Sequence, residues 1–66
     1  MEKQLTAREL EIVRHIAGGL TNQQIAKKLF LRTVTVSTHR KNMLAKLQLK
    51  NTASLVKYAA DHQLLQ

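Results

Sequence analysis

Arg32–Lys41, which reads RTVTVSTHRK, is the stretch that decides the fold. Its Thr-Val-Thr-Val centre alternates polar and apolar side chains and is rich in β-branched residues, a pattern typical of a half-buried strand. A strand needs a partner for its backbone groups, however, and no other segment of the chain shows convincing alternation. Continuing the spacing of Met43 and Leu47 backwards in helical register reaches Val36 instead.

The free energies also favour a helix. Each β-branched residue lowers helix propensity by only a few tenths of a kcal/mol. Full burial of an apolar side chain contributes roughly 1.5–3 kcal/mol. If Val36, Met43 and Leu47 are buried together, packing outweighs propensity, and we predict a helix that begins near Thr33.

Capping signals divide the rest of the chain into helices. Thr6 followed by Glu9 and Thr21 followed by Gln24 are both capping-box patterns. The pair Gly18-Gly19 can end the first helix, since a residue without Cβ takes the left-handed conformation easily. The predicted helices are about 7–18, 22–29, 33–48 and 52–62. With Leu64 and Leu65 folding back onto the core, residues 1–66 form one all-α domain.

The composition excludes several classes of protein. The chain has 66 residues and no cysteine, and its three histidines, at positions 15, 39 and 62, are dispersed. We therefore expect no metal site, no cofactor and no small-molecule ligand. No aligned nucleophile, base and orienting group is present, so we do not expect an enzyme. No apolar run approaches the length of a membrane span, and we expect a cytoplasmic protein without membrane contact.

Charge is the first indication of function. The formal net charge is +7, and no acidic residue lies between Ile12 and Ala60. Nine basic residues fall in that interval: Arg14, Lys27, Lys28, Arg32, Arg40, Lys41, Lys46, Lys50 and Lys57. Such a chain attracts polyanions, of which nucleic acid is the commonest. Arg8 and Glu9, in contrast, are expected to form a helix-start cap and a surface ion pair.

The helix over 33–48 has an outward face suited to DNA. With Val36 and Met43 inward, a rotation of 100° per residue places five residues outward: Val34, Ser37, Thr38, Lys41 and Ala45. Short side chains permit close approach to the major groove, hydroxyls reach base edges, and a lysine can donate to guanine. The brief connection Phe30-Leu31-Arg32 is the length that a helix-turn-helix requires.

Three blocks of sequence resemble the LuxR-type (NarL/FixJ-like) helix-turn-helix domain at the C-terminus of bacterial response regulators. Leu5–Glu9 (LTARE) looks like the family's opening motif, and Ile16–Ala26 (IAGGLTNQQIA) is similar to its central motif. Thr35–Leu47 (TVSTHRKNMLAKL) follows the family's Thr-Val-x-x-His-x-x-Asn-(x)₃-Lys-Leu spacing. The blocks are in register and cover nearly the whole chain.

The resemblance implies a four-helix domain that binds double-stranded DNA with its third helix. It places base contacts at Val34, Ser37, Thr38 and Lys41. It places phosphate contacts at Asn22, Thr35, His39 and Lys46. Arg40, which departs from the family pattern, is also expected to contact phosphate. It places a homodimer interface on DNA at the fourth helix, with Leu55, Val56 and Ala59 as the candidate residues, which would divide between that interface and the core.

The implied role is sequence-specific DNA binding on a two-fold related site, in transcription regulation. The chain would be the effector domain of a two-component response regulator, with RNA polymerase as a candidate partner. Two alternatives stay open from the sequence: a protein-interaction module, and a non-specific nucleic-acid binder on the same fold.

Three positions depart from the family pattern. Arg32 stands where the family often has a capping serine, so either Thr33 takes over the cap or the first turn is weaker until phosphate arrives. Ser37 replaces a common basic residue, which puts the base preference there in doubt. Arg40 replaces a common apolar residue and has to extend from the edge of the core.

Overall fold

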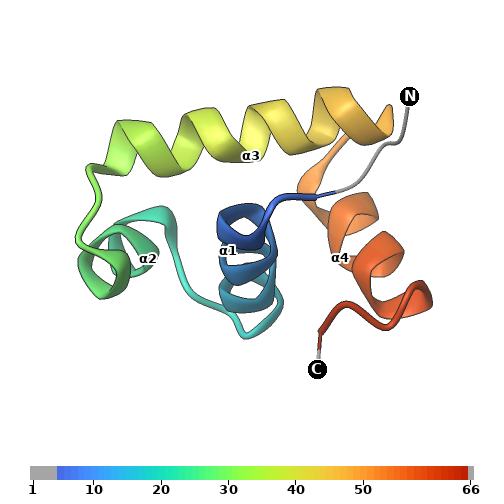
Figure 1. Cartoon of the computed structure of the whole chain (residues 1–66), viewed down its shortest axis with the longest axis horizontal. Helices are drawn as coiled ribbons and strands as arrows, with labels where there is room; N and C mark the ends of the chain where they lie inside the picture. Colours follow the sequence, from blue (N-terminus) through green and yellow to red (C-terminus); the bar gives the residue numbers. More distant parts are fainter. Residues whose placement is uncertain (1–4, 66) are drawn as a thin grey trace.

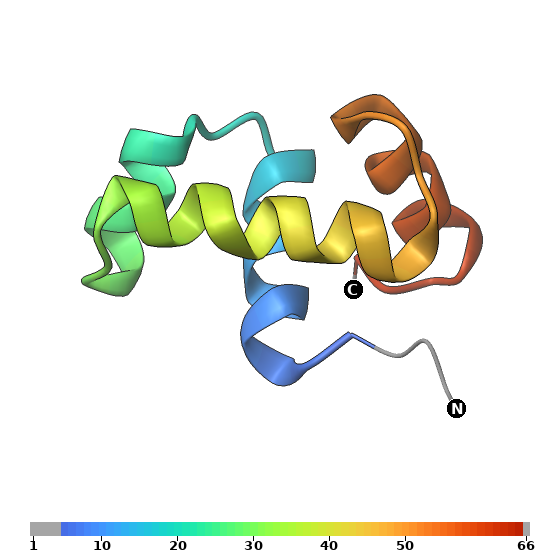
Figure 2. The same cartoon turned by 90° about the horizontal axis from the view of Figure 1, so that it is seen from above.

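The computed structural model describes residues 5–65 and contains four helices, with no strand among these residues. They are α1 (Ala7–Ala17), α2 (Asn22–Leu29), α3 (Thr33–Leu47) and α4 (Thr52–Asp61). Helix α3 lies across the other three (Figure 1), with α2 near one of its ends and α4 near the other (Figure 2). The all-α prediction is confirmed, and every helix boundary falls within one residue of its predicted position.

The stretch RTVTVSTHRK is the first part of α3 and not a strand. Val36 and Met43 are completely buried and Leu47 nearly so, as the helical register predicts. Packing against the other helices therefore outweighs the weak helix propensity of the Thr-Val-Thr-Val segment.

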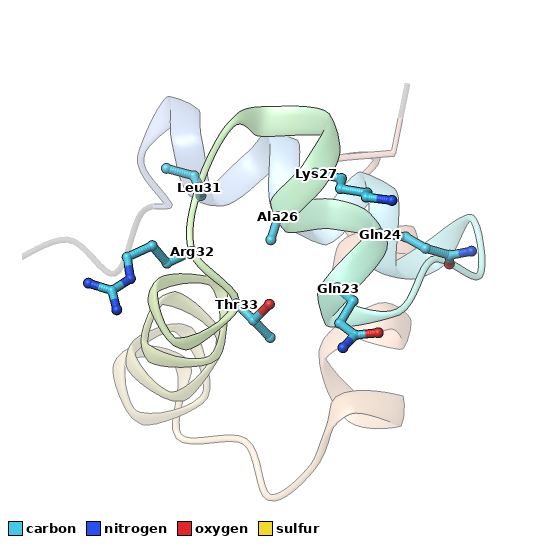
Figure 3. A pocket seen from close by; sticks show the side chains of 7 residues that line it. All are labelled: Gln23, Gln24, Ala26, Lys27, Leu31, Arg32 and Thr33. Atoms are coloured by element: carbon cyan, nitrogen blue, oxygen red, sulfur yellow. The ribbon is translucent and has the colours of Figure 1, made fainter.

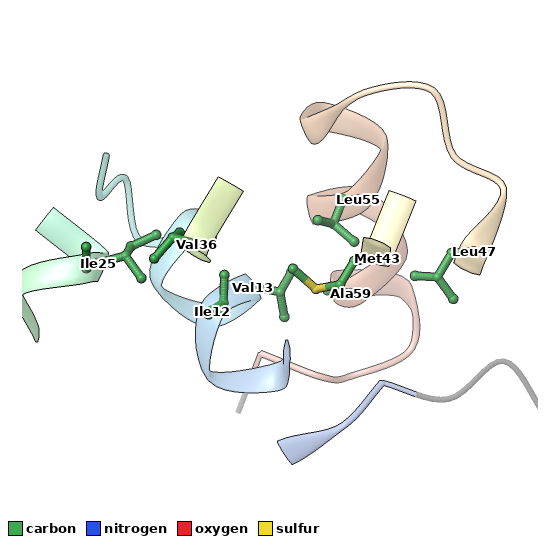
Figure 4. Close-up of a cluster of buried hydrophobic side chains, with 9 residues drawn as sticks. Ile12, Val13, Ile25, Val36, Met43, Leu47, Leu55 and Ala59 are labelled. Carbon is green, nitrogen blue, oxygen red and sulfur yellow. The ribbon is translucent and has the colours of Figure 1, made fainter. Parts of the chain in front are cut away.

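All four helices contribute to one apolar core. It consists of Ile12, Val13, Ile25, Ala26, Val36, Met43, Leu47, Leu55 and Ala59. In Figure 4, Ile25 and Val36 lie at the α2 end of the core, and Leu47, Leu55 and Ala59 lie at the α4 end. One side of α3 therefore packs on the core along the length of the helix, and its opposite side is left uncovered.

Three of the four helix starts are capped by a side chain. Thr6 and Thr21 each accept a hydrogen bond from the backbone N–H three residues on, at 3.2 Å, and Glu9 and Gln24 complete the predicted capping boxes. Asn51 caps α4. Only α3 begins without a side-chain cap.

The helix ends depend on left-handed residues. The predicted glycine end of α1 is confirmed at Gly19, whose φ of +94° is the conformation that favours glycine. Phe30 ends α2 with φ 58° and ψ 42°, and its ring is 95% exposed. A non-glycine residue in this region is uncommon, and the ring gains no burial in return.

A partly buried ion pair joins α1 to the last turn of α3. Lys46 Nζ lies 2.7 Å from Glu9 Oε1, which also accepts the backbone N–H of Thr6 at 2.8 Å. Burial raises the pKa of the Glu9 carboxyl, but the hydrogen bonds from Lys46 and Thr6 and the charge of Lys46 outweigh it, so the pKa lies below its ordinary value of 4.5.

The expected helix-start cap and surface ion pair are both present, one at each residue: Glu9 completes the cap, and Arg8 forms the surface pair. Glu9 does not pair at the surface, because its side chain is only 7% exposed and faces Lys46. Arg8 instead lies 3.6 Å from Glu11.

The C-terminal residues fold back as predicted. Leu64 and Leu65 are half-buried against the core, and Arg14 Nε donates to the Leu64 carbonyl oxygen at 2.9 Å. Within residues 5–65 no helix has the length and apolar content needed to span a membrane.

Candidate nucleic-acid interface

The N-terminal half of α3 carries the surface predicted to read DNA. Val34 is 63% exposed, and Thr38, Lys41 and Ala45 are exposed on the same side. Among residues 5–65, Val34 and Phe30 are the two large apolar residues that remain exposed. The predicted outward orientation of these four residues is confirmed.

Ser37 is not fully outward, and here the predicted orientation needs correction. The residue is half-buried, and its Oγ accepts a hydrogen bond from Asn22 Nδ2 at 3.1 Å. The two residues are 15 positions apart, so the contact braces the start of α2 against α3. Asn22 is predicted to contact phosphate, but one N–H of its side-chain amide is used in this hydrogen bond within the protein.

Thr38 also makes a hydrogen bond within α3. Its Oγ1 donates to the carbonyl oxygen of Val34 at 3.0 Å, one helical turn earlier. This bond fixes the side chain and leaves the methyl group and the oxygen lone pairs for a partner.

The first turn of α3 is open. Arg32 occupies the N-cap position with φ −81° and ψ 149°, and its side chain makes no cap hydrogen bond. Thr33 does not take over the cap, because it is already the first helical residue. The leading amides of α3 and the positive end of its dipole are therefore available to an anion.

The cations near this turn are not neutralised. Each carboxylate side chain in residues 5–65 already has a basic partner: Glu9 pairs with Lys46, Glu11 with Arg8 and Asp61 with Lys57. All three pairs involve α1 or α4. Helices α2 and α3 and their connection keep Lys27, Lys28, Arg32, Arg40 and Lys41 without a carboxylate partner in the described part of the chain.

An open hollow of about 520 Å³ lies between α2 and the start of α3. Its lining residues are Gln23, Gln24, Ala26, Lys27, Leu31, Arg32 and Thr33. Figure 3 shows the side chains of Lys27 and Arg32 extending away from each other, so their charges do not converge on one point. The hollow is a notch in the surface, without the geometry of an enclosed anion site.

The predicted phosphate-contact residues divide into two groups. Thr35, His39 and Arg40 are half-buried on α3 and retain accessible surface. Asn22 and Lys46 are held by Ser37 and Glu9. The Lys46 ammonium faces the buried Glu9 carboxylate and holds α3 on α1, and its contact with phosphate stays a prediction.

The predicted dimer residues on α4 also divide. Leu55 and Ala59 have no exposed surface and belong to the core, so they are corrected from interface to core. Val56 is half-buried and remains available to a partner, with exposed Ala53 and Ala60 on the same side of the helix.

Residues 5–65 contain no group of three or more histidine, cysteine or acidic side chains that could hold a metal ion. The exposed side of α3 carries short polar, aliphatic and cationic side chains. Such a surface suits a groove floor and its flanking phosphates.

Residues 3–59 match the family described as "Bacterial regulatory proteins, luxR family". The chain is 45% identical over 64 residues to the oxygen regulatory protein NreC of Staphylococcus aureus, covering 97% of this chain and 30% of that protein. It is 45% identical over 58 residues to the transcriptional regulatory protein MctR of Rhizobium johnstonii, covering 88% and 27%. It is 39% identical over 61 residues to the Fimbriae Z protein of Salmonella typhimurium, covering 92% and 29%.

A solved structure has the same fold. The response regulator ChrA of a heme-sensing two-component system superposes with a TM-score of 0.88 at 36% identity, covering 97% of this chain and 32% of that one. The chain thus spans about three-tenths of the length of these relatives. The matching family is one of regulatory proteins and not of enzymes.

Proposed function

Because the chain belongs to the luxR family of bacterial regulatory proteins, we propose that it binds double-stranded DNA sequence-specifically, with the N-terminal half of α3 in the major groove. The observation that carries this proposal is the start of α3. Its first turn has no side-chain cap, and its outward residues are short, aliphatic or cationic. This combination suits a helix that enters a groove by its N-terminus.

Each exposed residue of α3 has a role in this docking. Lys41 donates to the O6 and N7 acceptors of guanine, and Val34 contacts the methyl group of thymine. Ser37 and Thr38 lie between Val34 and Lys41 in the sequence, and they contact base edges as well.

Residues beside the groove contact phosphate. Thr35, His39 and Arg40 lie on the flanks of α3, and Arg32 stands at its open first turn. These contacts position the domain and supply the salt-dependent part of the affinity.

The domain binds as a homodimer on a two-fold related site. The proposal rests on the outer side of α4, where Val56 lies between Ala53 and Ala60 at helical spacing. Small side chains around one larger apolar residue allow two helices to approach closely. Val56→Glu is expected to abolish the second binding event on a full site while leaving binding to a half-site within about twofold, because an isolated carboxylate cannot be buried without a partner.

The chain acts as the effector part of a response regulator in the bacterial cytoplasm, where the DNA is. This part of the proposal is supported by the relatives, because ChrA is described as a response regulator and MctR as a transcriptional regulatory protein. The shared segment is about three-tenths of each relative, so the signal would be received outside it.

Selection of bound sequences from a random DNA library tests the proposal. We expect an enriched consensus with two-fold symmetry. An enriched sequence without symmetry would keep specific binding and contradict the dimer. Binding without enrichment would indicate a non-specific nucleic-acid binder, and no DNA binding at all would favour a protein-interaction module.

A further inference from the structure

Two hydroxyl groups stand next to each other on the reading side of α3, and their hydrogen bonds differ in direction. Ser37 Oγ is the acceptor in its bond with Asn22, whereas Thr38 Oγ1 is the donor in its bond with Val34. A free hydroxyl can both donate and accept, and it tolerates several bases. These two hydroxyls are each restricted by the fold.

The bond from Asn22 leaves Ser37 with a proton to donate. Asn22 Nδ2 occupies one lone pair of Ser37 Oγ at 3.1 Å. The Ser37 proton has no acceptor in the described part of the chain. A base edge facing Ser37 is therefore favoured when it offers an acceptor, as guanine does with O6 and N7 and thymine does with O4.

The bond to Val34 leaves Thr38 only as an acceptor. Its proton is directed at the Val34 carbonyl oxygen, 3.0 Å away along the helix. The exposed lone pairs of Oγ1 favour a base that offers an amino group, which is N4 of cytosine or N6 of adenine in the major groove.

Asn22 is directed towards Ser37 and into the protein. Its Nδ2 donates to Ser37 Oγ at 3.1 Å, and its Oδ1 is buried, with no hydrogen-bond partner among the described residues. The bond to Ser37 is the interaction that orients the carboxamide. This placement fits a residue that orients another side chain better than it fits a phosphate contact.

We propose that Asn22 is a positioning residue for base readout: it makes Ser37 a hydrogen-bond donor, beside Thr38 as an acceptor. The two neighbouring residues then select bases of opposite polarity, guanine or thymine facing Ser37 and cytosine or adenine facing Thr38. The inference rests on the proposed binding of α3 in the major groove and adds which base edges it selects.

Hydroxyl deletions test the two polarities separately. Random-library selection is repeated with Ser37→Ala and Thr38→Val, which keep the approximate shape of each side chain. Ser37→Ala should reduce a preference for guanine or thymine at one position by about twofold to tenfold, the contribution of one hydrogen bond. Thr38→Val should reduce a preference for cytosine or adenine at another position by a similar factor. Ser54→Ala, on α4, is the matched control and should leave the consensus unchanged.

Asn22→Asp tests the positioning role. A carboxylate can only accept hydrogen bonds, so the Ser37 hydroxyl should donate its hydrogen bond to the introduced carboxylate. Only the lone pairs of Ser37 Oγ would then be available to the base. The preference at the Ser37 position should then shift from guanine or thymine to cytosine or adenine, while the Thr38 position stays as it was. Overall affinity should fall for every sequence, because a negative charge is added near phosphate.

The outcomes separate this inference from the function on which it rests. If the native chain enriches no sequence, the proposed function fails. If it enriches a consensus that Ser37→Ala and Thr38→Val leave unchanged, or change with the opposite polarity, the function stands and the inference is overturned. Should Asn22→Asp prove unfolded by circular dichroism, the two hydroxyl deletions still decide between these results.

Discussion

The two ends of α3 are held to the rest of the protein differently. The C-terminal half is buried through Met43 and Leu47 and is fastened to α1 by the pair between Lys46 and Glu9. The N-terminal half has one completely buried residue, Val36, and exposes Val34 and other residues on its outer side. It begins at Arg32 without a side-chain cap.

In the proposed function, one end of α3 serves stability and the other serves recognition. A helix projected into a groove must keep one side and its first turn free of the protein's own contacts. Burial and charge pairing at the C-terminal end of α3 offset the loss of stability that results from these missing contacts. Substitutions in the two halves should therefore have separable effects.

The largest expected effect is in the buried half. Met43→Ala should lower the free energy of unfolding by about 2–5 kcal/mol, because it removes a completely buried side chain and leaves a cavity. Urea denaturation followed by circular dichroism measures it. Val34→Ala, an exposed position on the same helix, is the control and should change stability by less than about 0.5 kcal/mol. Equal losses for the two variants would refute the division of α3.

The ion pair gives a smaller effect with a pH signature. Glu9→Gln should lower the free energy of unfolding at pH 7 by roughly 1–3 kcal/mol, because Lys46 loses its charged partner. The folded pKa of Glu9 lies below 4.5, so its contribution is present above that value and is lost as the pH falls through the folded pKa.

The difference in stability between native chain and Glu9→Gln should therefore shrink as the pH is lowered from 7 to below the folded pKa. Lys57→Ala, which breaks the exposed pair with Asp61, should cost less than about 1 kcal/mol. A constant difference at all pH values would show that the Glu9 charge does not hold α3.

In the exposed half, Lys41→Ala should affect binding and spare the fold. We expect a loss of about 1–3 kcal/mol in affinity for the selected sequence, with relaxed preference at one base, and little change in unfolding. Fluorescence anisotropy with labelled duplexes measures the affinity for the selected sequence and for a sequence with that base changed. Lys50→Ala, an exposed lysine beyond the end of α3, should not change the base preference. If both lysines act alike on all sequences, the contact of Lys41 is with phosphate and not with a base.

The smallest expected effect is at the open cap. Arg32→Ser should raise the free energy of unfolding by about 0.5–1 kcal/mol, because serine at the N-cap accepts an amide of the first turn. DNA affinity should fall at the same time. Arg32→Ala also removes the charge but supplies no cap, so it should weaken binding without the gain in stability. A serine variant no more stable than the alanine variant would mean that the first turn of α3 gains nothing from a cap.

Local patterns in the sequence were enough to predict the fold. Thr6 with Glu9 and Thr21 with Gln24 lie three residues apart, and the spacing of Val36, Met43 and Leu47 follows one helix. Such signals lie within a few helical turns of one another, so they can be recognised in the sequence without knowledge of the tertiary structure.

The contacts that the sequence did not predict lie between helices. Asn22 meets Ser37 across 15 positions, and Lys46 meets Glu9 across 37. Helical periodicity does not predict these contacts, because they depend on how α1 and α2 cross α3. The burial of Leu55 and Ala59 likewise depends on which side of α4 faces the core, and helical spacing alone permits either choice.

The most direct test of the central claim is an amide chemical-shift titration of the isotope-labelled chain with the selected duplex. The account predicts that the largest shifts fall on residues 32–41, the open half of α3. The amides of Met43 to Leu47, in the buried half, should change much less. Shifts concentrated in α1 or in that buried half, with residues 32–41 unaffected, would contradict it.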